Sequence, residues 1–156
     1  MAVIDLTELP GALAKGAPII GLDLGTKTIG VAVSDASLMI ASPLALIRRT
    51  KFTADVEALF KLMAGRVAGG IVIGLPMNMD GSEGPRAQSA RAFARNLLRL
   101  KDIPIAFWDE RLSTEAVNRM LIDEADTTRA RRAKLVDKAA AAWILQGALD
   151  RLRTPR

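Results

Sequence analysis

The fold of this chain is decided between residues 19 and 34, which read IIGLDLGTKTIGVAVS. Two apolar runs, 19–24 and 28–34, are separated by a short segment that contains glycine, so we predict two strands joined as a hairpin. The first run closes on Asp23 and Leu24. A carboxylate at this point is unusual, because acidic side chains are almost never buried unless they are paired or bind a cation. The hairpin therefore carries the first candidate functional residue.

The remaining elements follow at the spacing of an α/β domain. We expect strands over 43–48, 70–75 and 103–108, and helices from a cap at Thr53 to about Gly65, from 84–85 to about 100, after a cap at Ser113 or Thr114, and over 129–151. This order predicts a mixed five-stranded sheet with helices on both faces. The domain spans 19–153, and residues 1–18 form an N-terminal extension of low order.

Composition limits the chemistry that the chain can perform. Its 156 residues suffice for one domain with an ordinary core, and they include neither cysteine nor histidine. Disulfides, thiolate nucleophiles, Ser–His triads and histidine metal ligands are therefore excluded. No apolar run approaches the roughly 18 residues that span a bilayer, and no secretory signal is recognisable, so we expect a cytoplasmic protein without membrane contact.

The charge balance points to a polyanionic partner. The net charge is +5 and the isoelectric point is about 10.1, which favours nucleic acid. Only six residues are aromatic, four Phe and two Trp, whereas proteins that stack single-stranded bases usually carry more. We therefore expect recognition of the backbone and shape of a nucleic acid more than stacking on its bases.

Three acidic residues from distant segments are candidates for one site: Asp23, Glu110 and Asp137. Asp23 and Glu110 follow apolar strands, and ligands bind at the carboxyl ends of strands in such sheets. Asp137 falls on the small, apolar face of the last helix. Each acid alone has an ordinary explanation, as a turn residue, a partner of a helix dipole, or a solvated boundary residue.

Together these acids favour a metal site. Two carboxylates about 4–5 Å apart repel each other by roughly 3–4 kcal/mol at an effective dielectric near 20. A proton or a cation must compensate this repulsion, and oxygen ligands suit hard divalent ions. We therefore expect Mg²⁺ or Mn²⁺ held by the three acids, and phosphoryl chemistry that needs no histidine.

Basic and hydroxyl side chains surround the three acids in the predicted fold. A dense basic group opens the last helix, one to two turns before Asp137, and the turn after Asp23 supplies further donors. Ser82 precedes the free amides of a helix N-terminus, which bind phosphate well. We expect the nucleic acid to contact Lys27, Ser82, Arg111, Arg129, Arg131, Arg132 and Lys134.

Four segments, 21–35, 74–82, 109–114 and 137–146, together resemble the YqgF/RuvX family of Holliday-junction-resolvase-like proteins. The resemblance implies an RNase H-like fold and a metal-dependent nuclease, with Asp23, Glu110 and Asp137 at the positions of the family's acidic triad. It also implies a role in maturing the 5′ end of pre-16S ribosomal RNA. Thr28 stands where the family usually has Arg, and Glu110 lies one strand beyond the usual position of this acid in RNase H-type enzymes.

The leading hypothesis is thus a metal-dependent endonuclease that acts on structured RNA, in a ribosomal precursor particle. One alternative is a Holliday-junction resolvase acting on branched DNA, which would require a homodimer rather than a monomer. Another is a non-catalytic factor that binds ribosomal RNA or the transcription machinery. The turn after Asp23 also resembles that of actin-like ATPases and sugar kinases, but those two-domain folds need more than twice this length.

Overall fold

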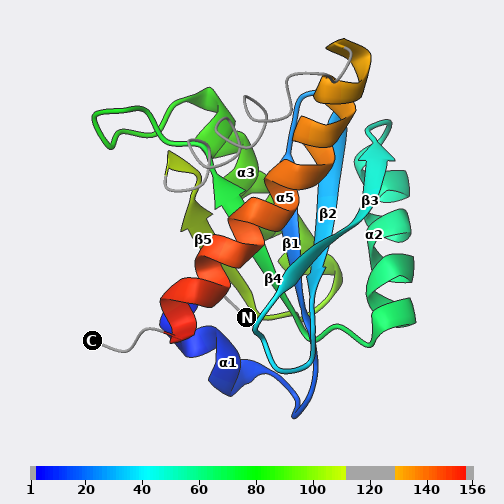
Figure 1. The fold of residues 1–156 in the computed structure, drawn as a ribbon, viewed down its shortest axis with the longest axis vertical. Helices are drawn as coiled ribbons and strands as arrows, with labels where there is room; N and C mark the ends of the chain where they lie inside the picture. Colours follow the sequence, from blue (N-terminus) through cyan, green and yellow to red (C-terminus); the bar gives the residue numbers. More distant parts are fainter. Residues whose placement is uncertain (1–2, 112–128, 154–156) are drawn as a thin grey trace.

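The computed structural model describes the backbone of residues 3–111 and 129–153, and the side chains of these ranges except 129–138. Five strands form one sheet in the order β3-β2-β1-β4-β5 (Figure 1). The strands are β1 (Ile19–Leu24), β2 (Thr28–Ser34), β3 (Ala41–Arg48), β4 (Gly70–Leu75) and β5 (Ile105–Asp109).

The sheet is mixed, as the sequence predicts. Strand β2 pairs antiparallel with both β1 and β3, whereas β4 pairs parallel with both β1 and β5. Strands β1, β4 and β5 therefore end at the same side of the sheet, which we call the carboxyl edge. Leu22 pairs with Ile73, and Gly74 pairs with Trp108, so the last residues of the three strands lie at similar heights.

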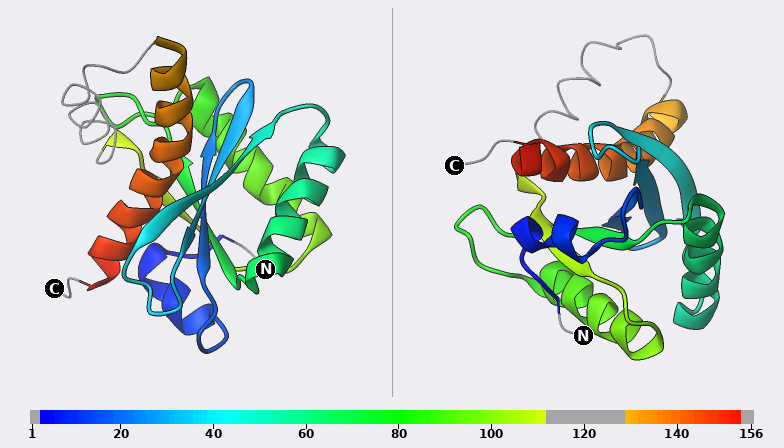
Figure 2. Two further views of the ribbon diagram at one scale, coloured as in Figure 1. Left: turned by 45° about the vertical axis from the view of Figure 1, so that its right-hand side comes forward. Right: turned by 90° about the horizontal axis from the view of Figure 1, so that it is seen from below.

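Helices cover both faces of the sheet, as predicted. Helices α2 (Phe52–Arg66) and α3 (Pro85–Leu100) cover one face. The other face carries α5 (Arg129–Arg153) and the N-terminal turns η1 (Leu6–Glu8) and α1 (Leu9–Ala12). The view from below shows the sheet between these layers (Figure 2). Both faces are buried, and this explains why β1 and β4 are nearly continuous apolar runs.

Alternation along the strands decides which side chains face which helix. Ile20 and Leu22 of β1 belong to the core beneath α2 and α3, whereas Ile19 belongs to the core beneath α5. Side chains two residues apart share a face, so Asp23 lies on the α5 face together with Gly21. On β4, Val72 and Gly74 lie on this same face.

Helix α5 approaches the sheet closely because glycines lie on both sides of the contact. A Cβ added at Gly21 would lie 2.7 Å from Leu145 Cβ and 3.2 Å from the carbonyl oxygen of Ala141. A Cβ added at Gly147 would lie 2.8 Å from Nε1 of Trp108 on β5. At Gly21 the backbone of β1 therefore packs almost directly on the helix, and at Gly147 the indole of Trp108 packs on the helix backbone.

Several element boundaries differ from the prediction. Strand β3 begins at Ala41, two residues early, and β5 begins at Ile105. The prediction that Thr53 caps α2 is wrong: the N-cap residue is Lys51, without a side-chain hydrogen bond. Buried Asp55 instead accepts a hydrogen bond from the Thr50 amide at 3.0 Å, so a carboxylate from within the first turn binds the entering chain.

The helix expected after Ser113 or Thr114 lies outside the described residues. In the described part of the predicted extension, residues 3–18, two short helical turns pack on the sheet and Leu9 is fully buried. The amide of Ile4 also donates to the carbonyl of Ile105 on the outer strand β5, at 2.9 Å. The division of the chain at residue 18 stays a prediction.

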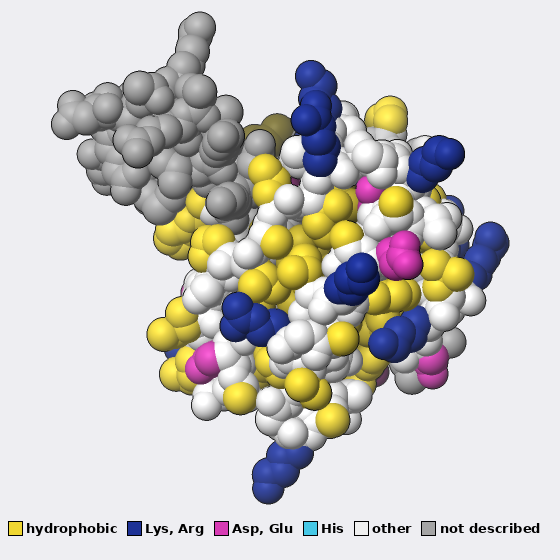
Figure 3. Space-filling view, turned by 90° about the vertical axis from the view of Figure 1, so that its right-hand side faces the viewer, with side chains coloured by type: hydrophobic (Ala, Val, Ile, Leu, Met, Phe, Trp, Pro, Cys, Tyr) yellow, Lys and Arg dark blue, Asp and Glu magenta, His cyan; other side chains and the backbone are white. Residues whose placement is uncertain are grey.

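Within the described residues, the structure has no helix of the length and apolarity needed to cross a bilayer. The face over α2 and β3 shows Lys and Arg side chains that stand apart from one another among apolar, uncharged and acidic ones (Figure 3). This face therefore does not present a continuous basic surface.

Candidate active site

Asp23 and Glu110 meet at the carboxyl edge of the sheet. Asp23 is the next-to-last residue of β1, and Glu110 directly follows β5. The Glu110 amide donates to the carbonyl of Leu75 at 3.1 Å, which extends the pairing of β5 with β4 by one residue. The two carboxyl groups are joined by a side-chain hydrogen bond across β4.

Gly74 makes this meeting possible. A Cβ at this position of β4 would lie 2.8 Å from Oε1 and 2.9 Å from Cγ of Glu110, and 2.6 Å from Cδ1 of Ile144 on α5. The Glu110 side chain therefore occupies the space above Gly74, between the sheet and α5. An acid that follows β5 thus reaches over a glycine of β4 toward β1.

Burial and Asp23 together change the ionisation of Glu110. Burial, the hydrogen bond with Asp23 and the negative charge of Asp23 raise the pKa of Glu110 to about 8, while Arg86 acts in the opposite direction. A carboxyl group with this pKa is largely protonated at neutral pH, so Glu110 donates the hydrogen bond and Asp23 accepts it. The pair thus holds one proton where a cation would otherwise supply the positive charge.

The neighbouring acid Asp109 has a different partner. Nη2 of Arg111 lies 2.6 Å from Oδ2 of Asp109, and Nε of Arg111 lies 3.1 Å from Oδ1. This hydrogen-bonded pair holds the pKa of Asp109 below its usual range. Of the two adjacent acids, only Glu110 is directed to Asp23.

Asp137 lies on α5 one helical turn before Ala141, whose carbonyl faces Gly21. One turn of helix advances about 6 Å, and the two residues from Gly21 to Asp23 advance about 7 Å. The first turns of α5 lie toward the edge at which β1 ends (Figure 1). Its helical position is therefore close to Asp23, whereas the Asp137 side chain lies outside the described part. Among the described side chains, no three acids form a group that could hold a metal ion.

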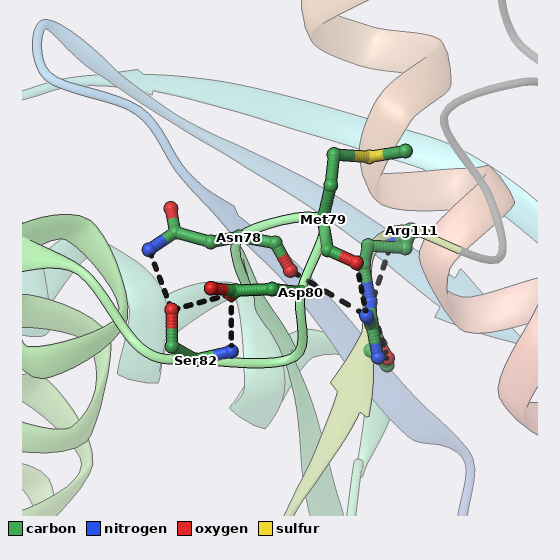
Figure 4. Close-up of polar contacts among 6 residues, drawn as sticks. Asn78, Met79, Asp80, Ser82 and Arg111 are labelled. Atoms are coloured by element: carbon green, nitrogen blue, oxygen red, sulfur yellow. Dashed lines mark hydrogen bonds and ion pairs between the residues drawn. The ribbon is translucent and has the colours of Figure 1, made fainter.

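The residues predicted to contact nucleic acid lie in several segments, and the structure describes the side chains of only some of them. Lys27 is exposed in the β1–β2 turn. Ser82 lies in the β4–α3 loop, and its hydroxyl donates to Oδ1 of Asp80 at 2.6 Å (Figure 4). Arg111 binds both Asp109 and this loop. The backbone of Arg129, Arg131, Arg132 and Lys134 forms the first turns of α5, and their side chains lie outside the described part.

Two arginines that the sequence analysis missed bind the turn after Asp23. Nη1 of Arg49 donates to the carbonyl of Gly25 at 2.8 Å, and Nη2 of Arg86 donates to the carbonyl of Leu24 at 3.4 Å. Arg86 also carries its charge close enough to Glu110 to act on its pKa. The sequence offers one signal for it: Arg86 follows the helix-opening Pro85, at the end of α3 that faces the carboxyl edge. Arg49 thus supplies the β1–β2 turn with a guanidinium group.

Solved structures show which class of fold this is. The structure matches that of T. thermophilus RuvC in complex with Holliday junction substrate, with a TM-score of 0.55 and 11% sequence identity, over 90% of this chain and 98% of that chain. It matches the Fowlpox virus resolvase with its substrate Holliday junction DNA at a TM-score of 0.51 and 9% identity, over 88% of this chain and 99% of that chain. The RNase H-like fold of resolvases, predicted from the resemblance, is confirmed.

The chain belongs to the RuvX family, described as Holliday junction resolvase, whose family model matches residues 17–151. A relative from Phenylobacterium zucineum is 73% identical over 154 residues, which cover 98% of this chain and 99% of the relative. One from Rhodospirillum rubrum is 62% identical over 156 residues, covering 100% and 97%. Both carry the name "Putative pre-16S rRNA nuclease". The predicted family and the predicted class, a nuclease and hence a hydrolase, are confirmed.

Proposed function

We propose that this protein is a metal-dependent endonuclease that hydrolyses phosphodiesters in the 5′ region of pre-16S ribosomal RNA. The observation that carries the proposal is the pair of Asp23 and Glu110, hydrogen-bonded to each other at the carboxyl edge of a resolvase fold. The substrate is inferred from the names of relatives that match nearly the whole chain.

The chemistry of the donors fits Mg²⁺ or Mn²⁺. Both ions prefer carboxylate oxygens, and Asp23 and Glu110 bring two carboxyl groups within hydrogen-bonding distance at the carboxyl edge. We propose Asp137 as the third ligand, because its helical position is one turn from the contact of α5 with Gly21. A bound divalent ion would activate water and stabilise the charge on the leaving oxygen.

The residues of the chain perform the remaining tasks. Gly74 provides the space that the Glu110 side chain occupies, beside Ile144 of α5. Arg86 is exposed beside the pair, where its guanidinium group suits the phosphate of a bound strand. We propose that Lys27 and the basic first turns of α5 contact flanking phosphates, and that Ser82 and Arg111 shape the loop beside them.

A second candidate substrate, branched DNA, is favoured by the description of the family as Holliday junction resolvase. Two symmetric cuts require two sites, so this function predicts a homodimer. Sedimentation of the purified protein at micromolar concentration distinguishes the candidates, because a protein that stays monomeric on binding a junction cannot make paired cuts.

A cleavage assay tests the proposal. Precursor 16S RNA and a four-way DNA junction are each incubated with the protein and Mg²⁺, Mn²⁺ or EDTA. We expect cleavage of the RNA with either ion and none with EDTA, and Asp23→Asn, Glu110→Gln and Asp137→Asn should each reduce the rate by at least about a hundredfold. Asp35→Asn, at the far end of β2, is the matched control and should cut normally. Equal rates in Asp23→Asn and the parent protein would exclude this site, and RNA binding without any cleavage would leave a non-catalytic factor.

A further inference from the structure

Met79 is an exposed apolar side chain on the rim of the candidate active site. It stands at the tip of the β4–α3 loop, residues 76–84, with 91% of its surface exposed (Figure 4). Exposed apolar residues that stand alone are common and need no explanation. This one differs from the others in its position, because β4 ends at the carboxyl edge and the loop begins there.

The other large, exposed apolar side chains of the described residues lie elsewhere. Val67 and Leu100 precede the starts of β4 and β5, and Met39 and Ile40 lie in the turn between β2 and β3. All four are at the opposite edge of the sheet, because β4 and β5 run parallel to β1 whereas β2 runs antiparallel. Within the described part of the chain, Met79 is therefore the large exposed apolar side chain on the side of Asp23 and Glu110.

Hydrogen bonds fix the tip of this loop. The Gly81 amide donates to the carbonyl of Asn78 at 2.9 Å, and Gly81 adopts a φ of 88°, which closes a tight turn with Met79 at its outer corner. The hydroxyl of Ser82 donates to Oδ1 of Asp80 and accepts from Nδ2 of the Asn78 side chain at 3.0 Å (Figure 4). The polar side chains of the tip thus bind one another, and the Met79 side chain projects away from them.

Two further contacts fasten the loop to the sheet. Nη1 of Arg111 donates to the carbonyls of Asn78 and Met79, at 3.4 and 3.3 Å, while the same guanidinium pairs with Asp109. At the base of the loop, Arg91 binds Glu83 through two hydrogen bonds of 2.6 and 2.7 Å. Met79 is therefore held in place relative to Glu110, since Arg111 is the next residue in the chain.

We propose that Met79 packs against an unstacked nucleobase at a branch or loop of the nucleic acid substrate, and so holds that irregular point at the active site. The proposal rests on the proposed function, since it needs a nucleic acid bound at the carboxyl edge. Apolar side chains that enter between bases hold a distorted backbone open, and the thioether of Met packs well on aromatic faces. A loop that is ordered before binding loses little entropy when the contact forms.

Packing of Met79 on a base would provide a contact that the composition of the chain otherwise makes scarce. The chain has few aromatic residues with which to stack bases. A single projecting Met gives preference for distorted over regular duplexes without reading a base sequence, because every base has an apolar face. The substrate class is therefore a structured nucleic acid with at least one base that leaves its stack at low cost.

The test separates binding from cleavage by using the Asp23→Asn protein as the parent. An RNA hairpin with an internal loop and a four-way DNA junction each carry 2-aminopurine, whose fluorescence rises on unstacking, at the irregular point. Met79→Ala, Met79→Leu and Leu100→Ala are compared in this background, and thermal melting verifies that each is folded. Leu100 is the matched control, an exposed apolar residue at the opposite edge.

We expect Met79→Ala to weaken binding of these substrates about tenfold, to lose the rise in fluorescence, and to bind a regular duplex as the parent does. Met79→Leu and Leu100→Ala should retain both signals. Unchanged binding and fluorescence in Met79→Ala would overturn the proposal, and so would an equal loss in Leu100→Ala. A protein with native Asp23 that cuts nothing, together with a Met79→Ala defect, would reject the nuclease activity and keep this contact. Failure of the parent to bind either substrate would reject both.

Discussion

Replacing Glu110 by Gln should remove a large part of the pH dependence of stability. In the folded, metal-free protein the pKa of Glu110 is raised to about 8, from an ordinary value of 4.5, mainly by burial and then by Asp23. The folded state thus binds more protons than the unfolded state between these two values. Stability from this group is fully present below pH 4.5 and is lost as pH rises through 8.

The size of the effect follows from the difference between the two pKa values. The difference of about 3.5 pKa units corresponds to at most about 5 kcal/mol of unfolding free energy. Because Glu110 is partly exposed, solvent screening reduces this figure, and we expect a loss of about 2–3 kcal/mol between pH 4.5 and 8.5. Gln keeps the size of the side chain and can still donate a hydrogen bond to Asp23, but it does not titrate.

Denaturant unfolding in EDTA, at intervals from pH 4.5 to 9, measures this loss. The native protein and Glu110→Gln should be similarly stable at pH 4.5, and the variant should be more stable by about 2–3 kcal/mol above pH 8. Asp35→Asn serves as the control, because backbone hydrogen bonds from Ile40 and Met39 lower the pKa of Asp35, so that it is ionised in both states across this range. Identical pH profiles for the native protein and Glu110→Gln would refute the reasoning.

Three further outcomes are expected. Gly74→Ala should cost about 1–3 kcal/mol of stability and slow cleavage at least tenfold, because its Cβ would displace Glu110; denaturation and cleavage rates check this, and a normal rate would contradict it. Gly21→Ala should destabilise the fold by a similar amount, because its Cβ would meet Leu145 Cβ at 2.7 Å and push α5 away from β1; an unchanged unfolding midpoint would be inconsistent with such close packing. Millimolar Mn²⁺ should raise the melting temperature, by mass action on the folded state, and Asp137→Asn should remove much of this rise. A shift of equal size in that variant would exclude Asp137 as a ligand.

Local sequence patterns predicted the five strands, the helices α2, α3 and α5 and their order, whereas the short turns η1 and α1 lie in a segment expected to be of low order. The hairpin at 19–34, the helix from Pro85 to Leu100 and the last helix from Arg129 are all visible as apolar periods with clear starts. The predicted cap of α2 was wrong: Thr53 has the right side chain for a cap, yet Lys51 occupies the position. The reason is that Asp55 already binds the chain at Thr50, a contact across the first turn that sequence preference for capping residues does not include.

The candidate site likewise combines residues that the sequence indicated with contacts that only the structure shows. The sequence indicated Asp23 and Glu110 because each ends an apolar strand, and the resemblance to the family implied these two acids together with Asp137. It did not indicate which of Asp109 and Glu110 turns inward, or that Arg86 stands beside them. The expected contact of Arg111 with nucleic acid stays a prediction; in the structure Arg111 binds Asp109 and the β4–α3 loop. The contact with the loop joins segments about thirty residues apart, which the local pattern does not record.

By itself, then, the sequence determined the architecture, the family and the absence of histidine and cysteine chemistry, because these depend on residue type and local period. Only the tertiary structure decided the ionisation of Glu110, the need for glycine at position 74 and the presentation of Met79. Each of these is a property of the space between segments: a carboxyl group changes its pKa through burial and neighbouring charge, and a glycine is required only where another side chain fills the room its Cβ would take.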